Sequence, residues 1–71
     1  MNNGYKDLIE ALTIFSKYSN TRWPTHCEHD VLYVWVNPEN VTEIDTKRLD
    51  ELGFIPDEDG YGFISFRFGS A

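Results

Sequence analysis

Apolar residues recur every three or four positions through residues 5–18, and this periodicity limits the folds open to the chain. Such intervals place side chains on one face of an α-helix. The helix has to bury that face against another element, so the rest of the chain must supply an apolar partner surface. The sequence predicts a first helix that ends near Ser19, with an inward stripe of Tyr5, Leu8, Ile9, Leu12, Phe15 and Tyr18.

The middle of the chain carries a strand signal and a second helix signal. Residues 31–36 are almost entirely β-branched or aromatic, which is typical of a buried strand. Residues 43–52 predict a short helix with Thr42 as its N-cap. Gly53 suits the left-handed position that follows a helix. Residues 21–30 contain a proline and no clear period, so we expect a loop there.

The C-terminal part predicts a hairpin. Residues 54–56 and 61–68 are rich in strand-forming side chains and flank an acidic turn. We expect the face of the last strand that carries Tyr61, Phe63 and Arg67 to be partly exposed. Alternation places Ile64, Phe66 and Phe68 on one face and Tyr61, Phe63, Ser65 and Arg67 on the other.

These elements predict an α+β fold in the order helix, strand, helix, strand, strand. The simplest arrangement is a three-stranded, mainly antiparallel sheet with two helices packed on one face. The chain has 71 residues, one cysteine and no internal repeat. We therefore expect a single compact domain over residues 1–71 without disulfides, with its ordered core at about residues 5–68.

The charge of the chain is concentrated in its middle. Twelve acidic and six basic side chains give a net charge of −6, and residues 25–59 hold ten of the acidic ones against Lys47 and Arg48. This balance argues against direct nucleic-acid binding, but an acidic surface steers encounters with basic partners. A mimic of DNA phosphates would need these carboxylates to line one face. The acidic candidates for partner binding are Glu43, Asp50, Glu51, Asp57, Glu58 and Asp59.

Both histidines and the only cysteine lie in the segment His-Cys-Glu-His-Asp at residues 26–30. Thiolate and imidazole bind zinc well, and a structural zinc site uses four ligands. His26, Cys27 and His29 could supply two or three of them, although the spacing matches none of the established zinc patterns. The other interpretation is a small buried Cys27 with polar neighbours that cap the loop.

The sequence contains no convincing catalytic constellation. Its adjacent carboxylates are typical of solvated turns and helix surfaces, and no glycine-rich phosphate loop opens a helix. The longest apolar run, residues 31–36, is far shorter than the roughly 20 residues of a membrane helix. The N-terminus lacks the pattern of a signal peptide. We therefore expect a cytoplasmic protein that is not an enzyme. Trp23, ahead of Pro24, is a candidate anchor for a protein partner.

Three stretches of the sequence carry a resemblance to a known group of proteins. They are Trp-Pro-Thr-His-Cys-Glu-His-Asp-Val-Leu-Tyr-Val, Leu-Asp-Glu-Leu-Gly-Phe and Phe-Ile-Ser-Phe-Arg-Phe-Gly-Ser. The chain resembles short, acidic, uncharacterised proteins of tailed bacteriophages and prophages over about residues 5–70. The resemblance implies an accessory protein of the host cytoplasm that binds and inhibits or redirects a host protein. It transfers no functional residues.

Two functions follow as expectations. The first is a non-catalytic module that binds a host-encoded protein, without a cofactor and without membrane or direct nucleic-acid binding. The alternative is a small zinc protein built on His26, Cys27 and His29. A homodimer also remains open, because a small sheet can offer an edge or an aromatic face to a second copy.

Overall fold

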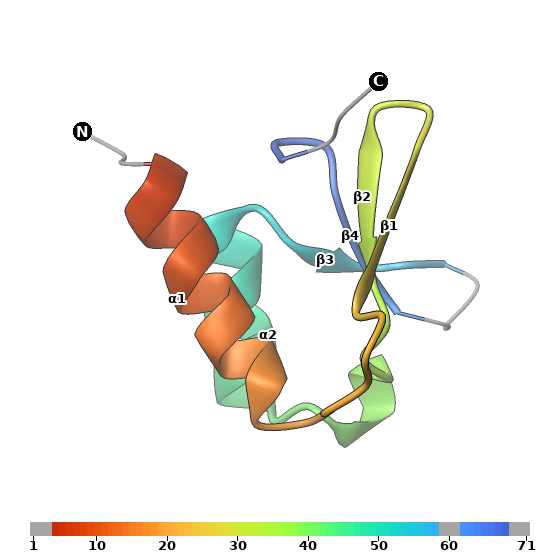
Figure 1. Ribbon diagram of the computed structural model, residues 1–71. Coiled ribbons are helices and arrows are strands. Elements are labelled where there is room, and N and C mark those ends of the chain that lie inside the picture. Colours follow the sequence, from red (N-terminus) through yellow and green to blue (C-terminus); the bar gives the residue numbers. More distant parts are fainter. Residues whose placement is uncertain (1–3, 59–61, 69–71) are drawn as a thin grey trace.

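The computed structural model describes residues 4–58 and 62–68, which form two α-helices and a four-stranded sheet (Figure 1). The sheet is antiparallel throughout, with the strand order β1-β2-β4-β3. The α+β class is confirmed, whereas the predicted three strands and the predicted element order differ from the structure. The elements are α1 (Gly4–Ser16), β1 (Thr25–Glu28), β2 (Val31–Val34), a 3₁₀ turn (Pro38–Asn40), α2 (Glu43–Leu52), β3 (Ile55–Pro56) and β4 (Phe63–Ser65).

The additional strand, β1, lies where a loop was expected. It pairs with β2 through a two-residue connection, and both connecting residues have positive φ, 53° at His29 and 65° at Asp30. This is the geometry of a type I′ hairpin turn, which histidine and aspartate tolerate better than most residues. The loop prediction was wrong because β1 is polar and exposed along its whole length, so no apolar alternation reveals it.

Local chemistry sets both ends of α2. The Thr42 hydroxyl accepts a hydrogen bond from the backbone N–H of Asp45 at 3.2 Å, as an N-cap does. At the other end, Gly53 has a φ of 102°, and the N–H of Phe54 donates to the Leu49 carbonyl at 2.8 Å. This bond belongs to a Schellman motif. The predicted bounds of the helix, its N-cap and its terminal glycine are confirmed.

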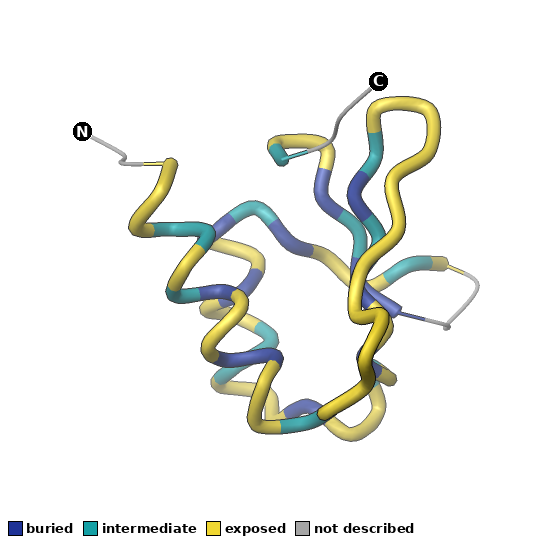
Figure 2. Tube along the Cα trace, in the orientation of Figure 1, coloured by how far each residue is buried: buried dark blue, intermediate teal, exposed yellow. Residues whose placement is uncertain are grey.

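Both helices lie on the same side of the sheet, and the core fills the space between them (Figures 1 and 2). The ring of Phe15 on α1 contacts those of Phe54 and Phe63, with centroids 5.3 and 5.1 Å apart. This aromatic contact joins the first helix to the last strand. The buried core consists of Ala11, Ile14, Phe15, Leu32, Val34, Val36, Val41, Leu49, Leu52, Phe54 and Phe63.

Helix α1 buries a narrower arc than its apolar stripe predicts. Ala11 and Phe15 are buried, whereas Tyr5, Ile9 and Leu12 are exposed. Because an α-helix turns about 100° per residue, these three side chains lie on a flank beside the buried arc. The predicted inward stripe is therefore wrong in part. Ala11 is completely buried, although its small side chain was not part of the predicted stripe.

The last strand presents to the core the face that was expected to be partly exposed. Phe63 and Ser65 are completely buried, whereas Phe66 is 69% exposed. Both faces of the segment are apolar, so alternation alone could not choose between them. Its antiparallel register decides: Phe63 lies opposite Val34, which is itself buried between the sheet and the helices. Tyr61, assigned to the same face, lies outside the described residues.

Candidate functional site

One face of the sheet carries no helix, and we call it the outer face. Directly opposed residues of neighbouring strands share a face, and successive residues alternate between the two. Leu32 and Val34 on β2 are buried on the helix side, so Tyr33 between them points to the outer face. Its cross-strand partners are His26 on β1 and Ile64 on β4. The register therefore brings side chains of three strands together on the outer face.

Three aromatic rings form a cluster on the outer face. The Tyr33 ring lies 6.0 Å from the imidazole of His26 and 6.3 Å from the indole of Trp35, measured between centroids. His26 and Trp35 are 6.4 Å apart, and their planes are inclined by only 26°. Trp35 remains 43% exposed. Aromatic side chains of this kind supply a large, rigid surface, and its burial by a partner makes the free energy of binding more favourable.

The cluster forms one wall of a hollow of about 370 Å³. Glu28 from β1 and Asp57 from the end of β3 contribute carboxylates to the same hollow. The Nε2 atoms of His26 and His29 lie 3.5 and 3.6 Å from the carboxylate oxygens of Glu28. Aromatic faces together with carboxylates suit a positively charged group, which both attract.

Three basic side chains, Lys17, Arg48 and Arg67, form ion pairs on the helix side of the molecule. Three ion pairs connect α1 and the segment after it to α2 and to the C-terminal segment. Exposed pairs of this kind each contribute about 0–1 kcal/mol to stability. They neutralise acidic side chains on that side. The pairs are Lys17 with Asp45 at 2.9 Å, Arg48 with Glu10 at 2.5 and 2.8 Å, and Arg67 with Asp7 at 2.8 Å.

Two of these pairs change the acidity of their members. The hydrogen bond from Tyr18 and then that from Lys17 lower the pKa of Asp45, because both favour its charged form. The bond from Arg48 lowers the pKa of Glu10 in the same way. The pKa values of Lys17 and Arg48 rise correspondingly, chiefly through the hydrogen bonds to their carboxylate partners. These carboxylates are therefore stabilised as anions inside the fold.

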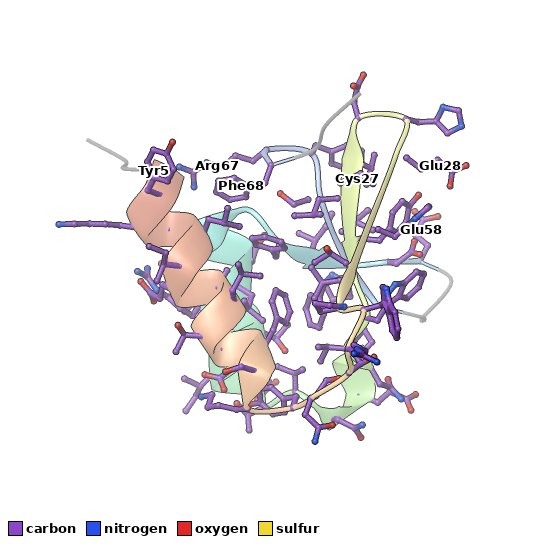
Figure 3. All side chains as sticks on the ribbon, in the orientation of Figure 1. Tyr5, Cys27, Glu28, Glu58, Arg67 and Phe68 are labelled. Atoms are coloured by element: carbon purple, nitrogen blue, oxygen red, sulfur yellow. The ribbon has the colours of Figure 1, made fainter. Side chains whose placement is uncertain are left out.

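The carboxylates near the outer face have different surroundings. Among the described residues, no lysine or arginine forms an ion pair with Glu28, Asp57 or Glu58. Figure 3 shows Glu28 and Glu58 on the side of the sheet that faces away from the helices. The hollow beside the aromatic cluster therefore contains two carboxylates, Glu28 and Asp57, that no described lysine or arginine pairs with.

The acidic residues singled out in the sequence do not share one face. Glu43 and Asp50 line a groove of about 690 Å³ between α2 and β3, together with Lys47. Glu51 lies on α2 with an oxygen 3.8 Å from the Arg48 guanidinium. The last three candidates divide as follows: Asp57 borders the outer hollow, Glu58 follows it, and Asp59 lies outside the described residues. This distribution does not meet the condition for DNA mimicry.

The candidate zinc ligands are separated by the strand that carries them. Cys27 is an exposed thiol opposite Leu32 and so points to the helix side, whereas His26 points to the outer face. His29 lies in the turn. Within residues 4–58 and 62–68, no group of three or more His, Cys, Asp or Glu side chains is arranged to hold a metal ion. The zinc hypothesis stays a prediction that only the sequence supports.

Trp23 is exposed, as an anchor for a partner would be. The residue is 71% exposed, and the guanidinium of Arg22 lies over its ring, 5.3 Å from the centroid. It does not line the outer hollow. The sequence reasoning missed Tyr33 and Glu28 as members of a site. Alternation along residues 31–35 could have found Tyr33 beside Trp35, but the position of Glu28 depends on β1.

No family model, curated protein or solved structure matches this chain. In the described part of the chain, neither helix has the length and apolar character needed to cross a membrane.

Proposed function

We propose that this protein is a non-catalytic module that binds another protein through the outer face of its sheet. The observation that carries the proposal is the hollow that combines the rings of Tyr33 and Trp35 with the carboxylates of Glu28 and Asp57. The resemblance to phage accessory proteins implies a host-encoded partner. The partner surface is basic, since it must complement the carboxylates of Glu28 and Asp57.

The aromatic rings and the carboxylates of the hollow contribute to binding in different ways. Burial of Trp35 and Tyr33 by a partner removes aromatic surface from water, and tryptophan and tyrosine are among the residues that dominate interface energies. The carboxylates contribute mainly to the rate of association and to the choice of partner, because salt screens exposed charges over about 8–10 Å. Binding should therefore weaken at raised salt without disappearing.

The two tryptophans of the chain provide a matched test. Immobilised wild-type protein and the variants Trp35→Ala and Trp23→Ala would be used to capture proteins from a host lysate, and each captured protein would then be purified and rebound. We expect the wild type and Trp23→Ala to retain the same partner and Trp35→Ala to lose it. A partner that Trp35→Ala retains, or that only Trp23→Ala loses, would contradict the proposal. Circular dichroism and urea unfolding would verify that both variants fold.

A further inference from the structure

Strand β1 forms one edge of the sheet and borders the outer hollow. Among the described strands it pairs only with β2. Backbone groups of an antiparallel strand point alternately toward and away from its partner. Glu28 and Val31 flank the two-residue turn, and their backbone groups form hydrogen bonds with each other. The next pair bonded in this way is His26 with Tyr33, two residues further along each strand. The N–H and C=O groups of Thr25 and Cys27 therefore point away from the sheet.

The two edges of the sheet differ in what they offer to another strand. The opposite edge, β3, has only two residues, and Pro56 has no N–H to donate. Strand β1 has four residues and contains neither lysine nor proline, the residues that commonly protect a sheet edge. The edge that can accept a further strand is therefore the one beside the aromatic cluster.

Register determines where the side chains of an added strand would lie. A residue opposite His26 would share its face and so project onto the outer face, toward the Tyr33 ring and the Glu28 carboxylate. If the added strand runs antiparallel to β1, its neighbours use their backbone groups to bond Thr25 and Cys27. One side chain of the added strand is thus directed to the hollow.

The chemistry of the hollow selects that side chain. An arginine guanidinium is planar, donates paired hydrogen bonds to carboxylates and stacks on aromatic rings. The hollow offers the carboxylates of Glu28 and Asp57 beside the rings of Tyr33 and Trp35. A lysine ammonium would gain the charge interaction but lose the stacking and the paired geometry. The net charge of −6 adds a general attraction for basic segments.

We infer that an extended, arginine-bearing segment of a protein partner adds antiparallel to the free edge of β1 and places its guanidinium in the outer hollow. The inference rests on the proposed function. It adds the conformation of the bound segment and the side chain that the site recognises. Main-chain hydrogen bonds to Thr25 and Cys27 supply affinity, and the hollow supplies specificity.

A short peptide tests the side-chain part of the inference. The probe is a capped heptapeptide, Thr-Val-Thr-Arg-Thr-Val-Thr, titrated by calorimetry against the full chain. Replacing its arginine by the neutral isostere citrulline should weaken binding about tenfold or more, since the guanidinium loses its charge, and lysine should bind with intermediate affinity. Equal binding of the arginine and citrulline peptides would overturn the inference.

Matched variants test the place of binding. Glu28→Gln keeps the shape of the side chain and should weaken the arginine peptide several-fold, whereas Glu43→Gln, in the groove between α2 and β3, should leave it unchanged. Equal effects of the two variants would show general charge attraction and overturn the site. Urea unfolding of both variants would establish that they fold equally well.

The peptide backbone tests the strand addition. N-methylation of the threonine that follows the arginine removes an N–H directed at β1 and should abolish binding. N-methylation of the arginine itself removes an N–H that points away and should have little effect. Equal effects would overturn the strand addition. A dimer in sedimentation whose Thr25 and Cys27 amides are protected from hydrogen exchange would also overturn it, because a second copy would then occupy β1. The two proposals can fail separately. If Trp35→Ala loses the lysate partner but the wild type does not bind the arginine peptide, this inference is overturned and the proposed function stands.

Discussion

Replacing Phe63 by alanine should remove a large part of the stability of this domain. The side chain is completely buried, and its ring centroid lies 5.1 Å from that of Phe15 on the first helix. Truncation of a buried phenylalanine to alanine costs about 3–5 kcal/mol, because the favourable burial of its apolar surface is lost and a cavity remains. A domain of 71 residues has a total free energy of unfolding of about 4–11 kcal/mol. The variant should therefore lose at least about a quarter of its stability, and at the lower end of this range it should not fold.

Phe66 provides the matched control, since it is the same residue type three positions along the chain and is 69% exposed. Phe66→Ala should change the unfolding free energy by no more than about 0.5 kcal/mol. Urea unfolding followed by circular dichroism measures both variants. The melting temperature of Phe63→Ala should also fall by at least about 12 °C, at roughly 4 °C per kcal/mol for a domain of this size.

The outcome decides which face of the last strand forms the core. If Phe63→Ala is too unstable to measure, Phe63→Leu keeps most of the apolar volume and should show a smaller loss in the same direction. A greater loss for Phe66→Ala than for Phe63→Ala would mean that the strand presents its other face to the helices. The register of β4 against β2, and with it the composition of the outer face, would then be refuted.

Three further predictions concern local structure and pH. Gly53→Ala should lower the unfolding free energy by about 1–2 kcal/mol in thermal unfolding, because its φ of 102° is unfavourable for any residue with a Cβ; an unchanged melting temperature would contradict the Schellman motif. Thr42→Ala should cost about 1 kcal/mol in urea unfolding through loss of the N-cap, with Thr42→Ser close to wild type, and equal losses in both would count against a capping role. Hydrogen bonds from Tyr18 and Lys17 hold the pKa of Asp45 below its ordinary value of 3.8, so the stability this group contributes is present above that value and lost as the pH falls through the lowered pKa. Asp45→Asn should therefore reduce the dependence of the melting temperature on pH below about 4, and an unaltered acid dependence would show that these hydrogen bonds contribute nothing.

The elements that sequence reasoning placed correctly are those whose limits depend on adjacent residues. Thr42 and Gly53 define α2 because an N-cap and a left-handed C-terminal glycine act within one turn of the helix. The first helix was also found from its periodicity. The face that the helix turns to the core was not found, because the burial of Ala11 depends on tertiary contacts that the sequence does not reveal.

The candidate site was only partly predictable for the same reason. The sequence identified the acidic excess and the segment that contains His26, but read that segment as a loop. Strand β1 owes its existence to pairing with β2 and to a turn with two residues at positive φ, and its own residues are polar. Without β1, neither the cluster of His26 with Tyr33 nor the approach of Glu28 could be inferred. Asp57 joins them only through the pairing of β3 with β4.

The location of the binding surface can be measured most directly by nuclear magnetic resonance on isotopically labelled protein titrated with the arginine peptide. We expect the largest changes in amide chemical shift in residues 25–28 and 33–35, and in Asp57, while α1 and α2 remain unaffected. Changes concentrated instead at Ile9 and Leu12 on the exposed flank of α1, or at Ile44 on α2, would contradict the assignment of the outer face as the binding surface.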